Sequence, residues 1–147
     1  MDSNFTVDPA SWRDLKSLRQ LEKVCFDMDA WPVWDLLGVL IFPSTVRLKA
    51  TAEGALIGFI SGDIRRWEGI GWITSLGVLP EFRRKGVGTA LLQACEERIK
   101  LPRLRLCVRK SNQAAISLYQ RAGYLQKETW PRYYMGGEDA LVMEKIR

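Results

Sequence analysis

A strand-like segment that runs through a basic, glycine-containing loop directly into a helix is the feature that most constrains the fold. Residues 70–79 read as a strand, and apolar residues then recur at helical spacing over about 86–99. The loop between them ends in Arg83-Arg84-Lys85-Gly86-Val87-Gly88-Thr89. Glycines in the first turn of a helix let backbone N–H groups approach a ligand, and the positive end of the helix favours a pyrophosphate. The loop therefore predicts a phosphate site, although a basic helix start whose glycines only form a turn has the same pattern.

The loop matches neither of the common nucleotide-binding patterns. No Gly-Lys-Ser/Thr follows at the spacing of a Walker A loop, and a dinucleotide fingerprint would follow the first strand of a parallel βαβ unit. Three adjacent cations nevertheless add charge attraction, and Thr89 offers a hydroxyl. Gly77, inside the preceding strand, predicts a bulge or the close approach of a ligand. An extended ligand that passes Gly77 and places its phosphates on Gly86 and Gly88 would suit a long pantetheine arm.

The rest of the chain predicts one domain, residues 1–147, with a mixed α/β fold. In chain order we expect a strand at 5–7, helices at about 9–26 and 33–41, strands at 46–50, 55–67 and 70–79, a helix at 86–99, a strand at 103–108, a helix capped by Ser111 and stopped by Gly123, and strands at 124–134 and 139–146 around a hairpin turn at 135–138. Pro9 is expected as the first helical residue, with Trp12 on the core face of that helix. This order indicates a mixed sheet with helices on both faces.

Composition removes several classes of function. The chain contains no histidine, which excludes Ser–His–Asp and Cys–His catalysis and every histidine-containing metal site, so no metal is expected. Cys25, Cys95 and Cys107 lack CxxC spacing, which indicates reduced thiols in a cytoplasmic protein. No apolar run approaches the ~20 residues of a membrane span, and no secretory signal is visible. The net charge is +5, but the cations are scattered over several elements, so we expect no nucleic-acid partner.

Two motifs together resemble the GNAT superfamily of acetyl-CoA-dependent N-acetyltransferases. The Arg83–Gly88 run matches the family's pyrophosphate motif, and residues 112–119 followed by Gly123-Tyr124 match its second cofactor motif. The resemblance covers almost the whole chain and implies a GNAT-like fold with a central, mostly antiparallel, twisted sheet of about seven strands. It also implies that acetyl-CoA is the acetyl donor and that these residues bind it: Leu76, Gly77, Val78, Arg83, Arg84, Lys85, Gly86, Val87, Gly88, Thr89, Asn112, Ala115 and Tyr119.

Within the superfamily the chain looks most similar to protein N-terminal acetyltransferases, some of which act on a ribosomal protein. The similarity lies in residues 73–76, in residues 106–112, and in Tyr133-Tyr134 before Glu138-Asp139-Ala140. It implies that the acceptor is the α-amine of a protein or peptide N-terminus, ribosomal proteins included. That acceptor would lie between Trp31-Pro32-Val33 and Tyr133-Tyr134, with Trp72 in the same pocket.

The resemblance implies direct attack of the amine on the thioester, without a covalent enzyme intermediate. Tyr119 matches the family's general acid, with packing in the core as its alternative, and backbone N–H groups near Leu76-Gly77-Val78 would stabilise the oxyanion. The base is the departure, because Cys107 stands where relatives carry glutamate or histidine, and Trp72 where some carry tyrosine. Neither is a good proton acceptor, and no histidine is present to activate Cys107 for an acyl-enzyme.

An α-amine needs less help from a base than a lysine does, because its pKa is ~7.7–8.0 against ~10.4. We therefore expect weak base assistance, with water or backbone carbonyls as acceptors, and a rate that climbs with pH. Two other functions remain open at this point. One is acetylation of a small-molecule amine, and the other is a catalytically weak acetyl-CoA-binding protein or partner subunit.

Overall fold

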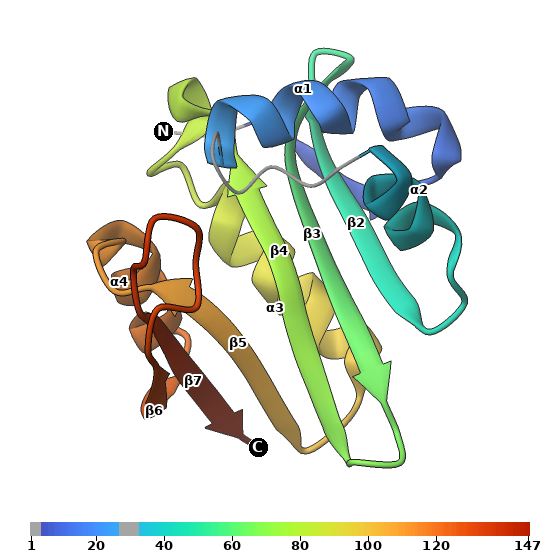
Figure 1. The fold of residues 1–147 in the computed structure, drawn as a ribbon. Coiled ribbons are helices and arrows are strands. Elements are labelled where there is room, and N and C mark those ends of the chain that lie inside the picture. The colour runs from blue at the N-terminus through green and yellow to red at the C-terminus, as the bar shows by residue number, and fades with distance from the viewer. Residues whose placement is uncertain (1–3, 27–32) are drawn as a thin grey trace.

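The computed structural model describes residues 4–26 and 33–147, which form seven strands and four α-helices (Figure 1). The strands are β1 (Thr6–Pro9), β2 (Thr45–Ala52), β3 (Ala55–Arg65), β4 (Ile70–Val78), β5 (Arg103–Arg109), β6 (Leu125–Trp130) and β7 (Ala140–Ile146). The helices are α1 (Leu15–Phe26), α2 (Val33–Ile41), α3 (Val87–Ile99) and α4 (Gln113–Arg121), with short 3₁₀ turns η1 (Trp12–Asp14) and η3 (Pro80–Phe82). Among the described residues, no helix is both long and apolar enough to cross a membrane.

All seven strands join one sheet in the order β1-β2-β3-β4-β5-β7-β6. Five of the six neighbouring pairs are antiparallel, and only β4 and β5 run parallel. The expected mixed, mostly antiparallel sheet is therefore confirmed. The parallel pair requires a crossover, and α3 supplies it on one face of the sheet.

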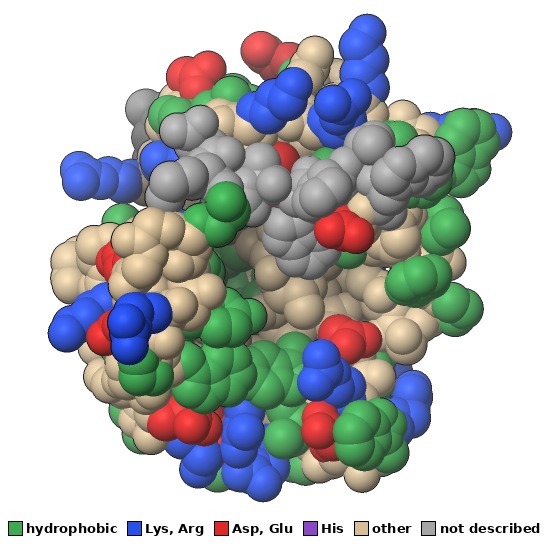
Figure 2. Space-filling view, in the orientation of Figure 1, with side chains coloured by type: hydrophobic (Ala, Val, Ile, Leu, Met, Phe, Trp, Pro, Cys, Tyr) green, Lys and Arg blue, Asp and Glu red, His purple; other side chains and the backbone are tan. Residues whose placement is uncertain are grey.

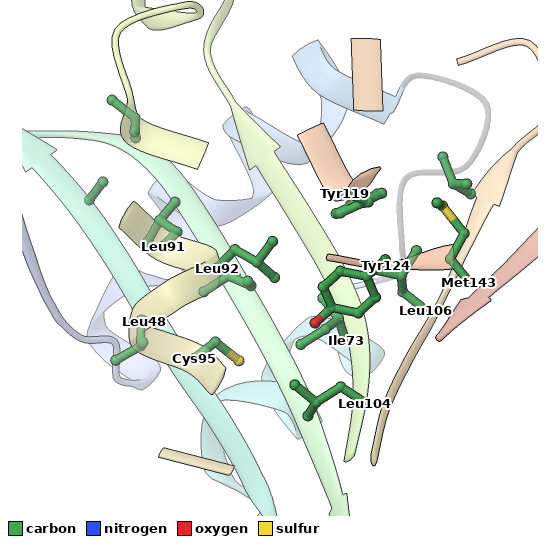
Figure 3. Close-up of a cluster of buried hydrophobic side chains, with 14 of the residues drawn as sticks. Leu48, Ile73, Leu91, Leu92, Cys95, Leu104, Leu106, Tyr119, Tyr124 and Met143 are labelled. Atoms are coloured by element: carbon green, nitrogen blue, oxygen red, sulfur yellow. The ribbon is translucent and has the colours of Figure 1, made fainter. Parts of the chain in front are cut away.

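Helices cover both faces of the sheet, as expected, and the alternation of side chains along β3 decides which residue meets which helix. Phe59 packs in a cluster with Leu18 and Leu21 of α1 and with Leu36 and Leu40 of α2. The next residue points to the opposite face, into the main core. There Ile60, Leu48, Leu91, Leu92, Cys95, Leu104, Leu106, Tyr119, Tyr124 and Met143 pack together, most of them labelled in Figure 3. Each fully buried leucine contributes roughly 1.5–3 kcal/mol.

The start of the first helical segment differs from the expectation. Pro9 belongs to β1, an edge strand where its missing N–H is tolerated, and the helical segment begins only at Trp12. Ser11 is the N-cap, because its hydroxyl accepts from the Arg13 N–H while Asp14 accepts from the Ser11 N–H. Trp12 lies in the 3₁₀ turn, off the apolar stripe of α1, and is 61% exposed. The prediction that Trp12 is a core residue was wrong.

Two boundaries in the second half also differ. Asn112, not Ser111, caps α4, since its side-chain oxygen accepts from the Ala115 N–H. The Ser111 N–H instead donates to Glu138. β6 ends at Trp130 rather than at residue 134, so a loop over 131–139 replaces the expected four-residue hairpin turn. The tip of this loop is a tight turn, in which the Tyr134 N–H donates to the Glu138 carbonyl and the Gly137 N–H donates to the Tyr134 carbonyl.

Candidate functional site

The two parallel strands at the middle of the sheet separate after four residue pairs. β4 and β5 pair from Ile70↔Arg103 to Ile73↔Leu106, and then each strand continues without the other (Figure 1). The separation begins at a β-bulge, because Ser75 pairs with Ser61 while Ile73 pairs with Gly62, which leaves Thr74 as the extra residue. Residues 74–78 therefore have no β5 partner for the backbone groups that face it, within the described part of the chain. An extended ligand can hydrogen-bond there as a strand would.

Gly77 does not form the bulge that the sequence analysis allowed. It pairs regularly with Phe59 of β3. A Cβ on Gly77 would lie 3.1 Å from side-chain atoms of both Leu21 and Phe26. The missing side chain thus lets α1 lie close against β4. The space at Gly77 is therefore filled by α1 and does not hold a ligand.

The basic loop lies at the end of β4, beside this separation, and opens α3. Gly86 is the N-cap with φ +83°, a conformation that favours glycine, and the first helical bond runs from the Ala90 N–H to the Gly86 carbonyl. The N–H groups of residues 87–89 precede that bond and have no partner inside the helix. The side chains of Arg83, Arg84, Lys85 and Thr89 are exposed around them, whereas Val87 is buried and offers only its backbone. This arrangement fits a pyrophosphate.

Arg83 is already engaged with the end of β4. Its Nε donates to the Val78 carbonyl at 2.9 Å, and the Cys25 thiol donates to the same oxygen at 3.4 Å. Arg84 and Lys85, the other two cations of the loop, do not bind that carbonyl. The Lys85 Nζ lies 5.6 Å from the Phe82 ring centroid.

Helix α4 lies next to the start of α3 and carries the second predicted motif. A Cβ on Gly88 would stand 3.3 Å from Leu118, so the two helices approach closely there. Tyr119 is 7% exposed and packs edge-on against Tyr124, with ring centroids 6.0 Å apart. It is thus part of the core. Burial raises the pKa of the Tyr119 hydroxyl to about 12, so the group keeps its proton and remains a hydrogen-bond donor at neutral pH.

Four aromatic rings form a continuous row that runs from β4 to the loop between β6 and β7. From Trp72 on β4, ring centroids follow at 6.2 Å to Trp130, 5.3 Å to Tyr133 and 5.0 Å to Tyr134. Figure 2 shows hydrophobic side chains gathered on this face around its hollowed centre. The indole Nε1 of Trp72 is buried and has no hydrogen-bond acceptor among the described residues. The structure therefore brings together the predicted residues Trp72, Tyr133 and Tyr134. Of the other predicted acceptor residues, Trp31 and Pro32 lie outside the described residues, and Val33 is the first residue of α2.

The loop that carries the two tyrosines is fixed to the end of β5. Arg109 donates to Glu138 at 2.9 Å and to the Met135 carbonyl at 3.1 Å, and its guanidinium lies 4.6 Å from the Tyr134 ring centroid. Hydrogen bonds from Ser111 and Arg109 hold the pKa of the Glu138 carboxyl below its ordinary value. The bonds to the Glu138 carboxylate weaken only as pH falls through that lowered pKa, so the loop keeps them at neutral pH.

Cys107 lies on β5 just past its last pair with β4, and it is half-buried. Burial, followed by the charge of Glu128, raises the pKa of the Cys107 thiol to about 11. The thiol is therefore neither a base nor a thiolate nucleophile near neutral pH. We expect Cys107→Ala to keep kcat within about threefold of the unmodified protein in a steady-state assay. A loss of about a hundredfold or more would instead show that the sulfur takes part in the chemistry.

One buried carboxylate was not among the residues predicted from the sequence. Glu22 on α1 is 2% exposed, and the Ser75 hydroxyl of β4 donates to its Oε2 at 3.3 Å. A signal was present, because Leu15, Leu18, Glu22 and Cys25 follow helical spacing, which places a charged residue on the apolar stripe. Among the described residues, no group of three or more cysteine, aspartate or glutamate side chains could hold a metal ion.

Comparison with known proteins agrees with this geometry. Residues 12–124 match the Acetyltransferase (GNAT) family. An uncharacterised N-acetyltransferase of Methanocaldococcus jannaschii is 34% identical over 139 residues, which cover 92% of this chain and 87% of that protein. N-alpha-acetyltransferase 20 of Dictyostelium discoideum is 37% identical over 71% of this chain and 64% of its own length. The crystal structure of the ribosomal-protein-S18-alanine N-acetyltransferase from Escherichia coli superposes with a TM-score of 0.86 over 97% of this chain and 93% of that one; at 24% identity, this shows a shared fold.

Proposed function

Because the chain belongs to the GNAT acetyltransferase family, we propose that it transfers an acetyl group from acetyl-CoA to the α-amine of a protein or peptide N-terminus. The observation that carries this proposal is the separation of β4 from β5 after four residue pairs. It leaves strand backbone for a donor on one side and the row of aromatic rings for an acceptor on the other.

The residues around the separation fit the donor. The backbone of Leu76, Gly77 and Val78 can pair with an extended amide-containing arm, in place of β5. At the end of β4, the N–H groups of residues 87–89, together with Arg84 and Lys85, suit two adjacent phosphates. Asn112 is the N-cap of α4 and Ala115 lies in its first turn; α4 approaches the start of α3 closely at Gly88. Acetyl-CoA supplies the acetyl thioester, and every other part of the chemistry falls to this chain.

The acceptor side favours a peptide with a free N-terminus. The rings of Trp72, Tyr133 and Tyr134 present apolar faces, and the buried Nε1 of Trp72 offers a donor to an acceptor carbonyl. The family resemblance also implies that residues 31–33 contact the peptide, and of these the structure describes only Val33. The relatives named N-alpha-acetyltransferase and the neighbour that acts on a ribosomal protein support an α-amine, ribosomal proteins included.

Tyr119 completes the donor side. The pKa of an ordinary thiol is ~8.5, well below the value of about 12 for the Tyr119 hydroxyl. The departing thiolate is therefore a weaker base than the Tyr119 phenolate. We therefore assign Tyr119 the role of a hydrogen-bond donor that stabilises negative charge on the sulfur. We assign the backbone N–H groups near Leu76 the same role toward the carbonyl oxygen.

Release of coenzyme A from acetyl-CoA, measured against a panel of amines, tests this function. The panel contains peptides with a free N-terminus, the same peptides with a blocked N-terminus and one lysine, and small amines. We expect turnover with particular free N-terminal sequences and a much lower rate with blocked peptides. Turnover of small amines alone would establish the other enzymatic function, and binding of acetyl-CoA without turnover would indicate a catalytically weak binding protein.

A further inference from the structure

A buried carboxylate and a hydroxyl lie against the segment of β4 that is separated from β5. Glu22 belongs to the face of α1 that packs on β4, and only 2% of it is exposed. Its contact with β4 is the hydrogen bond from Ser75, whose Oγ lies 3.3 Å from Glu22 Oε2. Ser75 is the neighbour of Leu76, whose N–H we place at the oxyanion. Ser75 is thus next in the chain to the residue whose N–H would bind the oxygen of the reacting carbonyl.

The bulge fixes the position of Ser75. Thr74, the extra residue, hydrogen-bonds through its hydroxyl to Ser61 at 2.8 Å, which anchors the bulge to β3. Ser75 is the first residue of β4 after the bulge and is half-buried, whereas Glu22 behind it is almost fully covered. An acceptor amine can therefore reach the Ser75 hydroxyl, and the Glu22 carboxylate only through it.

The other acidic side chains on this face are engaged by donors. Asp63 is bound by Arg65, Glu138 by Arg109, and Glu144 by Arg103, Arg105 and Lys127. Glu128 is exposed and accepts from Trp130 Nε1. Glu22 accepts a hydrogen bond from Ser75 of β4, and the Cys25 thiol of its own helix, which in turn interacts with Arg83, lies close to it. Asp35 of α2, the helix packed on α1, is exposed.

We propose that Ser75 and Glu22 form a relay that takes the proton from the attacking α-amine, an inference that rests on the proposed function. As the amine nitrogen bonds to the acetyl carbon, its proton moves to Ser75 Oγ, and the Ser75 hydroxyl proton moves to Glu22. The carbon–sulfur bond breaks with its electron pair on sulfur, hydrogen-bonded by Tyr119, and Glu22 later returns its proton to solvent. Protonation removes a buried negative charge, which offsets the difficulty of taking a proton from an amine. Ser75 contacts the substrate, and Glu22 acts through it.

Steady-state rates of Glu22→Gln and Ser75→Ala over about pH 6.5 to pH 9 test the relay. General-base assistance typically contributes about 10²–10⁴-fold, and the α-amine is already partly neutral, so we expect kcat to fall about ten- to a hundredfold in each variant. The KM for acetyl-CoA should stay unchanged. The deficit should shrink as pH rises, because hydroxide then replaces the relay. The double variant should be no slower than the slower single variant, since both changes break one path.

Ser17→Ala is the matched control, because it removes an exposed hydroxyl from α1 that lies outside the relay. It should keep the pH profile of the unmodified protein. If Glu22→Gln fails to fold, Ser75→Ala alone carries the test. Single variants that keep the unmodified pH profile, or a double variant whose losses multiply, would overturn the relay. Acetylation of a lysine instead of the α-amine would contradict the proposed function, while the pH profiles on that acceptor would still decide the relay.

Discussion

Tyr119→Phe is expected to lower kcat about a hundredfold while the protein remains folded. Removal of one donor aimed at developing charge typically costs about 10²–10³-fold in rate. The Tyr119 hydroxyl stays protonated because burial raises its pKa to about 12, so this donor is present over the whole assay range. Phenylalanine keeps the edge-on contact with Tyr124. Steady-state kinetics with acetyl-CoA and the best peptide measure the effect.

The alternative for Tyr119 is a residue that only packs in the core. In that case Tyr119→Phe would keep most of its kcat, and only larger changes such as Tyr119→Ala would matter, through stability. A thermal melt of Tyr119→Phe close to that of the unmodified protein, combined with the lost rate, separates the two roles. An unchanged kcat would remove Tyr119 from the chemistry.

Lys145→Met is expected to lower the free energy of unfolding by about 2–3 kcal/mol. Glu96 on α3 is 6% exposed, and it accepts from Lys145 at 3.0 Å and from the Tyr124 hydroxyl at 2.7 Å. Removal of the lysine leaves a buried carboxylate without its cation. The loss is less than for a fully buried pair, because the Lys145 side chain is 24% exposed. Urea denaturation measures it.

A triple variant controls for the loss of packing around Lys145. Glu96→Leu, Tyr124→Phe and Lys145→Met together replace the whole polar network with apolar groups, which is often neutral or stabilising. We expect the triple variant to recover most of the stability that Lys145→Met loses. If the triple variant is as unstable as the single one, the network is not what holds α3 to β7 at this point.

The strand, loop and helix over residues 70–99 could be predicted closely from the sequence. β4 ends at Val78 and α3 covers Val87–Ile99, within a residue or so of the expected bounds. The reason is local, because strand alternation, a glycine N-cap and helical periodicity are each visible over short stretches. The family and its fold followed from the loop motif in this segment together with the second motif over residues 112–124, and both are confirmed.

Features that depend on tertiary neighbours could not be predicted. Gly77 was interpreted as space for a ligand, but it makes space for Leu21 and Phe26 of α1, which are distant in sequence. Pro9 was expected to start a helix, but an edge strand accepts it equally well. Glu22 showed a charge on an apolar stripe, yet its partner Ser75 lies 53 positions away. Local patterns find elements, whereas contacts between elements decide the roles of single residues.

The most direct test of the central claim uses one peptide that carries both a free α-amine and an internal lysine. After incubation with the protein and acetyl-CoA, tandem mass spectrometry locates the added acetyl group. The proposed function predicts that the first residue carries it, with the lysine unmodified, and that a peptide blocked at its N-terminus gives almost no product. An acetyl group on the lysine side chain, at equal or greater yield, would contradict α-amine acetylation.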